Sequence, residues 1–203
     1  MSALPSTEDV HHFWFGEEAG APGVLATKAK LWFNGGKDFD RELTEKFLPL
    51  LETLSAGPLA EDWAGRGAAG RLSAILVLDQ MSRNIFRGSP RAFAQDRLAL
   101  HLCKDGLAKG EDAGLSEVER VFFYLPLEHS EAMEDQQRAF ALFEALAKDA
   151  RAPFADFAKM TLDYAHQHLD VIRQFGRFPH RNALVGRLST PDEEAWLADG
   201  GGF

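Results

Sequence analysis

The chain has 203 residues, of which 45% are hydrophobic, with a formal net charge of −9 and a single cysteine, Cys103. This length favours one domain spanning residues 1–203 with a substantial core, and the acidic balance disfavours general binding to nucleic acids or anionic membranes. One cysteine excludes an internal disulfide and a cysteine-based zinc site, and no apolar run approaches the ~20 residues of a membrane helix. Because the N-terminus also lacks a signal-peptide pattern, we expect a cytoplasmic protein.

Helix signals follow one another along the chain. Ser6 and Asp9 have the spacing of a capping box, which predicts a first helix through Phe15. Asp38 and Asp96 are expected to cap two later helices, and apolar residues recur at helical spacings between such signals. Further helices are therefore expected at residues 24–33, 38–55, 71–86, 96–108, 116–126, 131–150 and 153–175, with a short one after Thr190.

Three features of the second half predict local detail. Pro126 is expected to end its helix, because proline cannot donate a backbone hydrogen bond. Ser130 is expected to act as the N-cap of the following helix, with Glu131 in the first turn. On the last long helix, Met160 and Tyr164 are expected on the core-facing stripe.

No segment shows the alternating pattern of a strand flanked by turn signals. Short loops predict that consecutive helices pack antiparallel. The sequence therefore predicts an all-α, single-domain antiparallel array of about nine or ten helices. It shows no self-similarity at a 34-residue period and thus no direct repeat signal.

Arginine is concentrated in two stretches that contain no acidic residue. Residues 80–95 hold three arginines and residues 171–189 hold four, together seven of the fourteen in the chain. A guanidinium group can grip a carboxylate or phosphate through two parallel hydrogen bonds. Two explanations stay open: these arginines face an anionic ligand, or they pair with acids elsewhere, such as Asp79, Asp96 or Glu128, in structural networks.

The helix around residues 78–87 carries an ordered polar stripe. Asp79, Arg83 and Arg87 are spaced i, i+4, i+8 on one face, and Gln80 and Asn84 lie on the adjoining face. A solvated helix face would usually be rich in Lys and Glu. We therefore favour a face that lines a site over a solvated face with a helical ion pair.

Candidate acid/base groups lie outside this helix as well. Glu128, His129 and Glu131, in the turn 125–131, could transfer protons or bind a hard metal ion. His168 lies on or beside the apolar stripe of the last long helix, either as a hydrogen-bonded core residue or as a site residue. The candidates for catalysis are His129, His168, His180, Asp79 and Glu128.

The stretch Phe175–Gly–Arg–Phe–Pro–His–Arg–Asn182 follows a helix stop at Gly176. Two Arg, one His and one Asn beside two Phe are unusual for a connector, which is normally small and polar. We interpret this loop as the wall of a site. The side chains that would form it are Arg177, Phe178, His180, Arg181 and Asn182.

Several recognisable chemistries are absent from the sequence. It contains no Gly-rich phosphate loop, no His-Glu-x-x-His and no Gly-x-Ser-x-Gly. The spacing of His166 and His168 is too short to argue for a metal. Cys103 lies in an apolar helix and is expected to be buried rather than nucleophilic. We therefore predict neither a metal site nor a cofactor.

Long motifs in these same segments resemble a known family. They are Leu78–Asp–Gln–x–x–Arg–Asn–Ile–Phe–Arg–Gly88 with Ser89–Pro–Arg–Ala–Phe93, Tyr124–Leu–Pro–Leu–x–His–Ser–Glu131 with Gln136, Phe175–Asn182 followed by Gly186–Arg187, and the opening Phe13–Trp–Phe–Gly16. The chain is identified as a member of a bacterial domain-of-unknown-function family, DUF924. The resemblance spans nearly the whole chain and implies an all-helical, tetratricopeptide-like superhelical fold. It implies no established activity, so no catalytic role comes from it. Met81 stands where the family often has an aromatic residue.

We expect helix 71–87, turn 125–131 and loop 175–182 to converge on one concave pocket between helices. The first hypothesis is that this pocket binds a small anionic molecule or a peptide carboxylate. The second is a hydrolase or transferase that acts on an anionic substrate with a His–carboxylate acid/base pair. The third is a tetratricopeptide-like protein–protein interaction scaffold. The sequence leaves the oligomeric state open. The proposed ligand-binding residues are Asp79, Gln80, Arg83, Asn84, Arg87, Glu128, His129, Arg177, Phe178, His180, Arg181 and Asn182.

Overall fold

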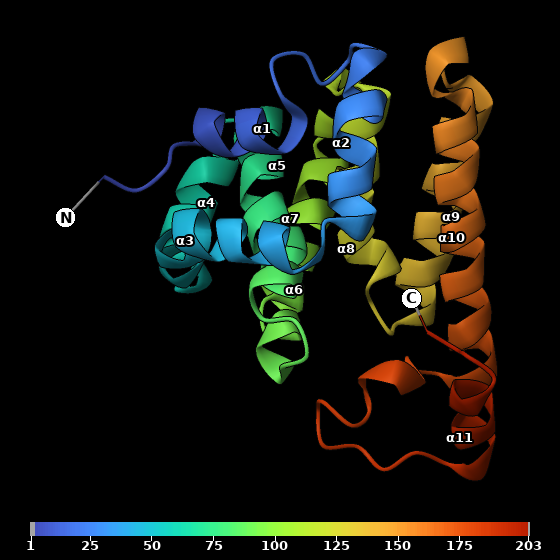
Figure 1. The fold of residues 1–203 in the computed structure, drawn as a ribbon. Coiled ribbons are helices and arrows are strands. Elements are labelled where there is room, and N and C mark those ends of the chain that lie inside the picture. The colour runs from blue at the N-terminus through green and yellow to red at the C-terminus, as the bar shows by residue number, and fades with distance from the viewer. Residues whose placement is uncertain (1–2, 203) are drawn as a thin grey trace.

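The computed structural model describes residues 3–202 and shows an all-helical protein (Figure 1). These residues contain no strand and eleven α-helical segments. The π-helical stretch η1 joins α5 and α6 into one continuous helix, so the described residues form ten helices. The predicted all-α class with about nine or ten helices is therefore confirmed. The helices are α1 (Thr7–Phe15), α2 (Gly23–Asn34), α3 (Gly36–Ser55), α4 (Pro58–Ala64), α5 (Ala68–Ile75), η1 (Leu76–Met81), α6 (Ser82–Ile85), α7 (Asp96–Ala108), α8 (Glu117–Glu128), α9 (Met133–Asp149), α10 (Ala155–Phe175) and α11 (Pro191–Ala198).

Helices α1 to α8 gather on one side of the molecule, and α9 and α10 stand together as a long antiparallel pair on the other (Figure 1). The chain after α10 passes through the short 3-10 helix η5 (Pro179–Arg181) before it reaches α11. This return brings the 175–182 loop back toward the earlier helices. Among the described residues, none of the helices has the length and apolar character needed to cross a membrane. The tetratricopeptide-like superhelix stays a prediction.

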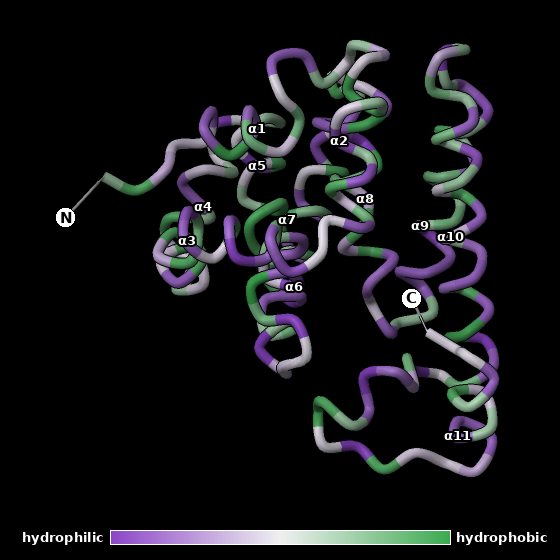
Figure 2. The backbone as a smooth tube through the Cα atoms, viewed as in Figure 1, coloured by the Kyte–Doolittle hydropathy of each residue, from purple (hydrophilic) through white to green (hydrophobic). Residues whose placement is uncertain are grey.

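Green and purple alternate along the helices in Figure 2, because each helix buries one face. Aromatic rings fill the main core where α1, α2 and α8 meet. The ring centroid of Phe122 lies 5.5 Å from that of Trp14, 5.6 Å from that of Phe15 and 4.9 Å from that of Trp32. The indole of Trp32 also donates to the backbone oxygen of Trp14 at 3.0 Å. These contacts fix the C-terminal end of α2 beside α8.

The capping box of Ser6 and Asp9 is confirmed, since each side chain accepts a hydrogen bond from the backbone nitrogen of the other. Neither predicted aspartate cap is correct. Asp38 lies within the first turn of α3, which begins two residues earlier, and Asp96 is the first residue of α7. The carboxylate of Asp96 is instead occupied by arginine side chains.

The connection between α8 and α9 also differs from expectation. Pro126 lies inside α8, which continues to Glu128. Ser130 does not cap α9; its hydroxyl accepts from the backbone nitrogen of Ala132 at 3.2 Å and donates to Asp135 at 2.8 Å. Glu131 precedes the helix, so its carboxylate is available to a distant segment. The local capping pattern was therefore overridden by tertiary contacts.

The expected core stripe of α10 is wrong at two positions. Met160 and Tyr164 are 36% and 45% exposed. Phe157, which was expected on this stripe, is buried, and Ala165 and Leu169 are buried beside it. Helix α10 packs against both α9 and α8, and Met160 and Tyr164 lie outside these contact faces.

The helix formed by α5, η1 and α6 runs through the centre of the fold. Its residues from Leu72 to Leu78 are buried, and Asp79 and Ser82 within it are fully buried as well. A π-helical stretch shifts the register of side chains and often occurs at functional sites. The hydroxyl of Ser82 satisfies the backbone oxygen of Leu78 at 2.6 Å within this stretch. One cavity is lined by three polar residues of this helix, Gln80, Arg83 and Asn84.

Candidate functional site

A cavity of about 750 Å³ lies where α8, α10 and the central helix face the 175–182 loop. Each of the three segments predicted to converge contributes to its lining. The central helix contributes Gln80, Arg83, Asn84 and Arg87, the α8 end contributes Leu125, Glu128 and His129, and the loop contributes His180 and Arg181. Segments separated by about 50 residues in the sequence thus share one site.

Asp79 is the buried centre of the polar network, and its side chain is fully inaccessible to solvent. Its Oδ1 accepts a hydrogen bond from Nδ1 of His129 at 2.9 Å and lies 3.2 Å from Nη1 of Arg83. Its Oδ2 accepts from the amide of Gln80 at 2.7 Å. Because the ionised carboxylate accepts a hydrogen bond from Nδ1–H, the neutral His129 ring carries its lone pair on Nε2.

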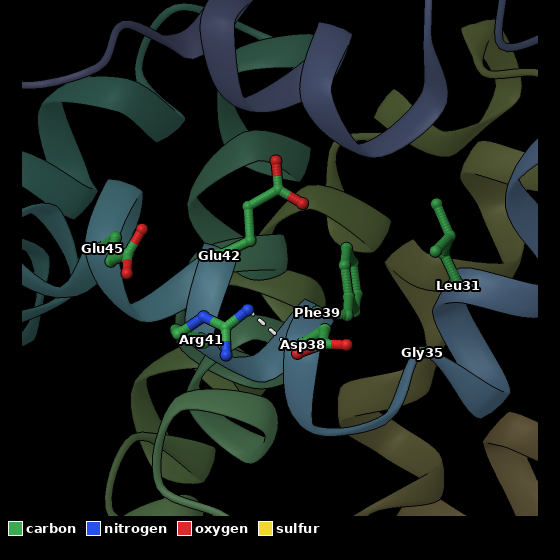
Figure 3. Close-up of a pocket in the computed structure, with 7 residues that line it drawn as sticks. All are labelled: Leu31, Gly35, Asp38, Phe39, Arg41, Glu42 and Glu45. Atoms are coloured by element: carbon green, nitrogen blue, oxygen red, sulfur yellow. Dashed lines mark ion pairs between the residues drawn. The ribbon is translucent and has the colours of Figure 1, made fainter.

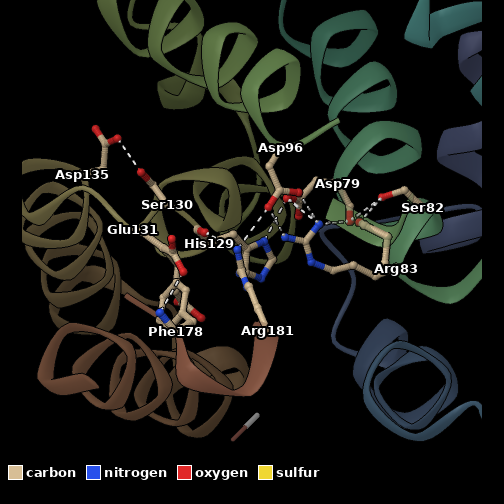
Figure 4. A network of polar contacts seen from close by, with 12 residues as sticks. Asp79, Ser82, Arg83, Asp96, His129, Ser130, Glu131, Asp135, Phe178 and Arg181 are labelled. Atoms are coloured by element: carbon tan, nitrogen blue, oxygen red, sulfur yellow. Dashed lines mark hydrogen bonds and ion pairs between the residues drawn. The ribbon is translucent and has the colours of Figure 1, made fainter. Parts of the chain in front are cut away.

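A second acid, Asp96, joins two arginines that lie far apart in the sequence, Arg83 and Arg181 (Figure 4). Arg83 donates to both of its carboxylate oxygens, at 3.0 and 3.1 Å. Arg181 donates to Asp96 at 3.3 Å and to the backbone oxygen of His129 at 3.1 Å. Arg83 is thus part of a structural ion-pair network with Asp79 and Asp96, which is one of the two explanations that the sequence left open for the arginine-rich stretches.

The guanidinium of Arg181 is clamped between two phenylalanine rings. It lies 4.8 Å from the ring centroid of Phe93 and 4.6 Å from that of Phe178. The residue is only 8% exposed, and its Nε is buried without a hydrogen-bond partner. Cation–π contacts on both faces hold the group in place, while its hydrogen-bonding capacity is only partly used.

Burial and neighbouring charges set the protonation states here. Burial pushes the pKa of Asp79 upward, but the charge of Arg83 and the hydrogen bonds from His129 and Gln80 hold it well below its usual range. Burial and the charge of Arg83 lower the pKa of His129 below 6.5, despite the opposing effect of Asp79. His129 is therefore a neutral imidazole at pH 7. Burial and the charge of Arg83 also lower the pKa of Arg181 to about 10.

Glu128 and His168 form a second buried pair in the cavity wall. Nδ1 of His168 donates to the backbone oxygen of Tyr164 at 2.9 Å and lies 3.2 Å from Oε1 of Glu128. Burial, followed by the charge of Asp79, raises the pKa of Glu128 to about 8, and burial lowers the pKa of His168 to about 3. Both groups are therefore uncharged at pH 7. The Oε2 atom of Glu128 is buried without a hydrogen-bond partner.

At the rim of the cavity, Asp40 of α3 binds two residues of the predicted polar stripe. The amide of Asn84 donates to its Oδ1 at 2.8 Å, and Arg87 donates to both of its oxygens at 2.7 and 2.9 Å. Lys37 also lines this side. Arg87 is thus a paired, exposed rim residue rather than an uncommitted cation.

Some predicted residues do not line the cavity. Arg177 donates to both oxygens of Glu193 at 2.6 and 2.7 Å, and Asn182 donates to the same carboxylate at 3.2 Å. Phe178 is fully buried behind the cavity wall, where its ring contacts the guanidinium of Arg181 and the imidazoles of His168 and His180. His180 does line the cavity, and burial lowers its pKa to about 4.

Glu131 fixes the loop that carries Arg181. It accepts from the backbone nitrogen of Phe178 at 2.8 Å, and both of its oxygens accept from Arg187 at 2.7 and 2.8 Å. Arg187 additionally donates to the backbone oxygen of Phe178 at 3.1 Å. The arginine-rich loop is therefore held against the start of α9 by a charge-assisted clamp.

Sequence reasoning missed one wall of the cavity. Trp32 and Phe33 from the end of α2, and Thr161 and Tyr164 from α10, line it as well. With His168, the α10 residues are spaced i, i+3, i+7, which is the signature of one helix face. That spacing was visible in the sequence, but Tyr164 reads equally well as a core residue.

A second, smaller hollow of about 390 Å³ lies beside α3 (Figure 3). Phe39 and Leu31 line it together with Asp38, Arg41 and Glu42. Arg41 forms an exposed ion pair with Asp38 at 2.9 Å. Its charged groups are solvated, and none of the predicted site residues lies there. Within residues 3–202, no group of three His, Cys, Asp or Glu side chains is placed to hold a metal ion.

The chain belongs to a family of bacterial proteins of unknown function, DUF924, whose family model matches residues 10–201. This confirms the resemblance found from the motifs. The chain is also similar to the solved structure of ATU0120, a protein of unknown function from Agrobacterium tumefaciens. The two share 34% sequence identity and a TM-score of 0.79, and the match covers 96% of this chain and 97% of that one. No curated protein matches the chain.

Proposed function

We propose that this member of the DUF924 family binds a small anionic molecule, or a peptide carboxylate, in the cavity between α8, α10 and the central helix. The observation that carries the proposal is a pair of unsatisfied polar atoms on residues that line this cavity. Nε of Arg181 and Oε2 of Glu128 are both buried without hydrogen-bond partners, on residues that are 8% and 3% exposed. Buried polar groups are rarely left in this state without a reason.

The protonation states favour an anion over a cation or a neutral ligand. At pH 7 Arg181 is charged, whereas the raised pKa of Glu128, about 8, keeps that side chain protonated. Both groups are then hydrogen-bond donors. His129 is neutral, so it adds no charge to the cavity wall. A wall with a charged guanidinium and a protonated carboxyl group suits a ligand that offers acceptors, such as a carboxylate or phosphate oxygen.

The test is isothermal titration calorimetry and thermal shift with acetate, butyrate, octanoate and inorganic phosphate. A bound anion raises the melting temperature by mass action. Arg181→Met should weaken binding at least about tenfold, because a hydrogen bond to a charged group contributes about 1.5–3 kcal/mol. The matched control is Arg173→Met, which removes an exposed arginine paired with Asp170 on the outer part of α10. If no anion binds, or if Arg181→Met binds as tightly as the wild type, the proposal fails.

A second candidate function, a hydrolase or transferase, is favoured by one specific contact. The Nδ1–Oδ1 distance of 2.9 Å between His129 and Asp79 forms a carboxylate–imidazole pair in which His129 lines the cavity. In such a pair, Nε2 accepts a proton from a nucleophilic hydroxyl or water while the carboxylate orients the ring. The protonated Glu128, one residue away, would donate a proton to the leaving group, and Arg181 would stabilise the developing negative charge.

This second function predicts a bell-shaped dependence of rate on pH. Activity should rise as His129 loses its proton below pH 6.5, since its pKa is lowered from that value. It should fall as Glu128 ionises near pH 8, because its pKa is raised to about that value. A screen of nitrophenyl esters and nitrophenyl phosphates measures it, and His129→Gln should abolish turnover. Turnover that survives this substitution excludes His129 as the base.

A further inference from the structure

The walls of the cavity change from apolar to polar along two helices. On α8, Val121 and Leu125 precede Glu128 at spacings of four and three residues, which places them on one face. On α10, Thr161 and Tyr164 precede His168 in the same way. Because Oε1 of Glu128 lies 3.2 Å from the imidazole of His168, the polar ends of the two series meet.

The apolar end is closed by aromatic side chains of α2. The ring of Trp32 lies 6.3 Å, and that of Phe33 6.4 Å, from the ring of Phe157, one helical turn before Thr161. The α2 aromatics are thus at the far end of the α10 series from His168. Val121, Leu125 and Trp32 are buried, and they give this end a dry wall.

Two large apolar side chains at this end remain open to solvent. Phe33 is 46% exposed and Tyr164 is 45% exposed, and both line the cavity. Aromatic surface left in water is unfavourable by about 25 cal/mol for each Å² that a ligand could cover. The exposed aromatics therefore lie where an apolar ligand group would gain most from burial.

We propose that the ligand is an amphipathic acid, with its anionic group beside Arg181 and Glu128 and an apolar body against Leu125, Phe33 and Tyr164. This inference rests on the proposed anion-binding function and adds the chemical class of the ligand. The seven-residue span from Thr161 to His168 corresponds to about 10 Å along a helix. An unbranched carboxylic acid of about eight carbons has that length. A medium-chain acid or an arylalkanoic acid fits both ends, whereas acetate and phosphate reach only the polar one.

The experiment compares chain length and headgroup on the wild-type protein by calorimetry. Octanoate should bind at least about tenfold more tightly than butyrate, since burial of each added methylene is favourable. Octyltrimethylammonium has the same tail but a cationic head, and it should bind at least about tenfold more weakly than octanoate. Equal binding of octanoate and octyltrimethylammonium would overturn the inference by showing unspecific apolar association.

Two substitutions locate the apolar end. Phe33→Ser and Tyr164→Ser change exposed positions and should each weaken octanoate binding several-fold while butyrate binding stays unchanged. Met160→Ser is the matched control, because Met160 is a 36% exposed apolar residue of α10 outside the cavity lining. If butyrate and octanoate bind equally, or if Met160→Ser has the same effect as the other two, the substrate class is wrong while anion binding stands. If none of the anions binds, it is the proposed function itself that fails.

Discussion

The buried carboxyl of Glu128 makes the stability of the protein depend on pH in a direction that one substitution can test. Burial, followed by the charge of Asp79, raises the pKa of Glu128 from 4.5 to about 8. The folded protein therefore keeps a proton that the unfolded chain releases, and the associated stability, complete below pH 4.5, is lost as the pH rises through 8. Since each pKa unit corresponds to about 1.4 kcal/mol, the loss is roughly 3–5 kcal/mol.

Glu128→Gln replaces the neutral acid by an amide of similar shape that does not ionise. We expect the variant to be more stable than the wild type by roughly 3–5 kcal/mol near pH 8, where the folded wild type loses its proton. The two proteins should be nearly equally stable near pH 4.5, where Glu128 is protonated in the folded wild type. Urea unfolding of both proteins across this range measures the difference, in which the contributions of other titrating groups cancel.

The result that refutes this reasoning has the opposite sign. Nδ1 of His168 lies 3.2 Å from Oε1 of Glu128, so an ion pair is the alternative to two neutral groups. Removal of one partner from a buried ion pair is strongly destabilising. A variant that is less stable than the wild type at pH 7, or a stability difference that is constant across the range, would exclude the neutral pair.

Two further substitutions test the packing around the site. Arg83→Met removes the guanidinium that compensates the fully buried Asp79, and it should reduce the free energy of unfolding by about 3 kcal/mol in urea whether or not a ligand binds; an effect below about 1 kcal/mol would contradict that role. Gly106→Ala would place a Cβ 2.5 Å from the side chain of Arg71 and should destabilise the protein by at least about 1–3 kcal/mol. Gly23→Ala, whose Cβ meets nothing within 4 Å, is the control and should not destabilise it in the same urea unfolding assay.

The helices could be predicted from the sequence because their signals are local. Capping residues and helical spacing lie within a few positions of one another. The composition of three short segments was sufficient to single them out, and the structure brings Arg83, His129 and Arg181 together at one cavity. Whether they bind a ligand there stays a prediction.

The pairings could not be predicted, because they join residues far apart in the sequence. Asp40 binds Arg87 across 47 positions, and Glu131 binds Arg187 across 56. Asp40 did not stand out, since an isolated carboxylate on a helix reads as a solvated residue. Glu131 was expected as a first-turn residue or an acid/base candidate, not as the partner of a distant arginine. The same ambiguity made Tyr164 look like a core residue, although it lines the cavity.

The two arginines at the centre differ in how well their charge is balanced, and this difference decides which one is available to a ligand. Arg83 contacts both acids of the network, at 3.2 Å from Asp79 and 3.0 Å from Asp96. Arg181 contacts only Asp96, at 3.3 Å, and the charge of Arg83 beside it lowers its pKa. An incoming anion therefore stabilises Arg181 more than Arg83. Arg83 holds Asp79 in place, and Asp79 in turn orients His129. Arg181 of the loop is therefore the arginine whose positive charge is available to a ligand.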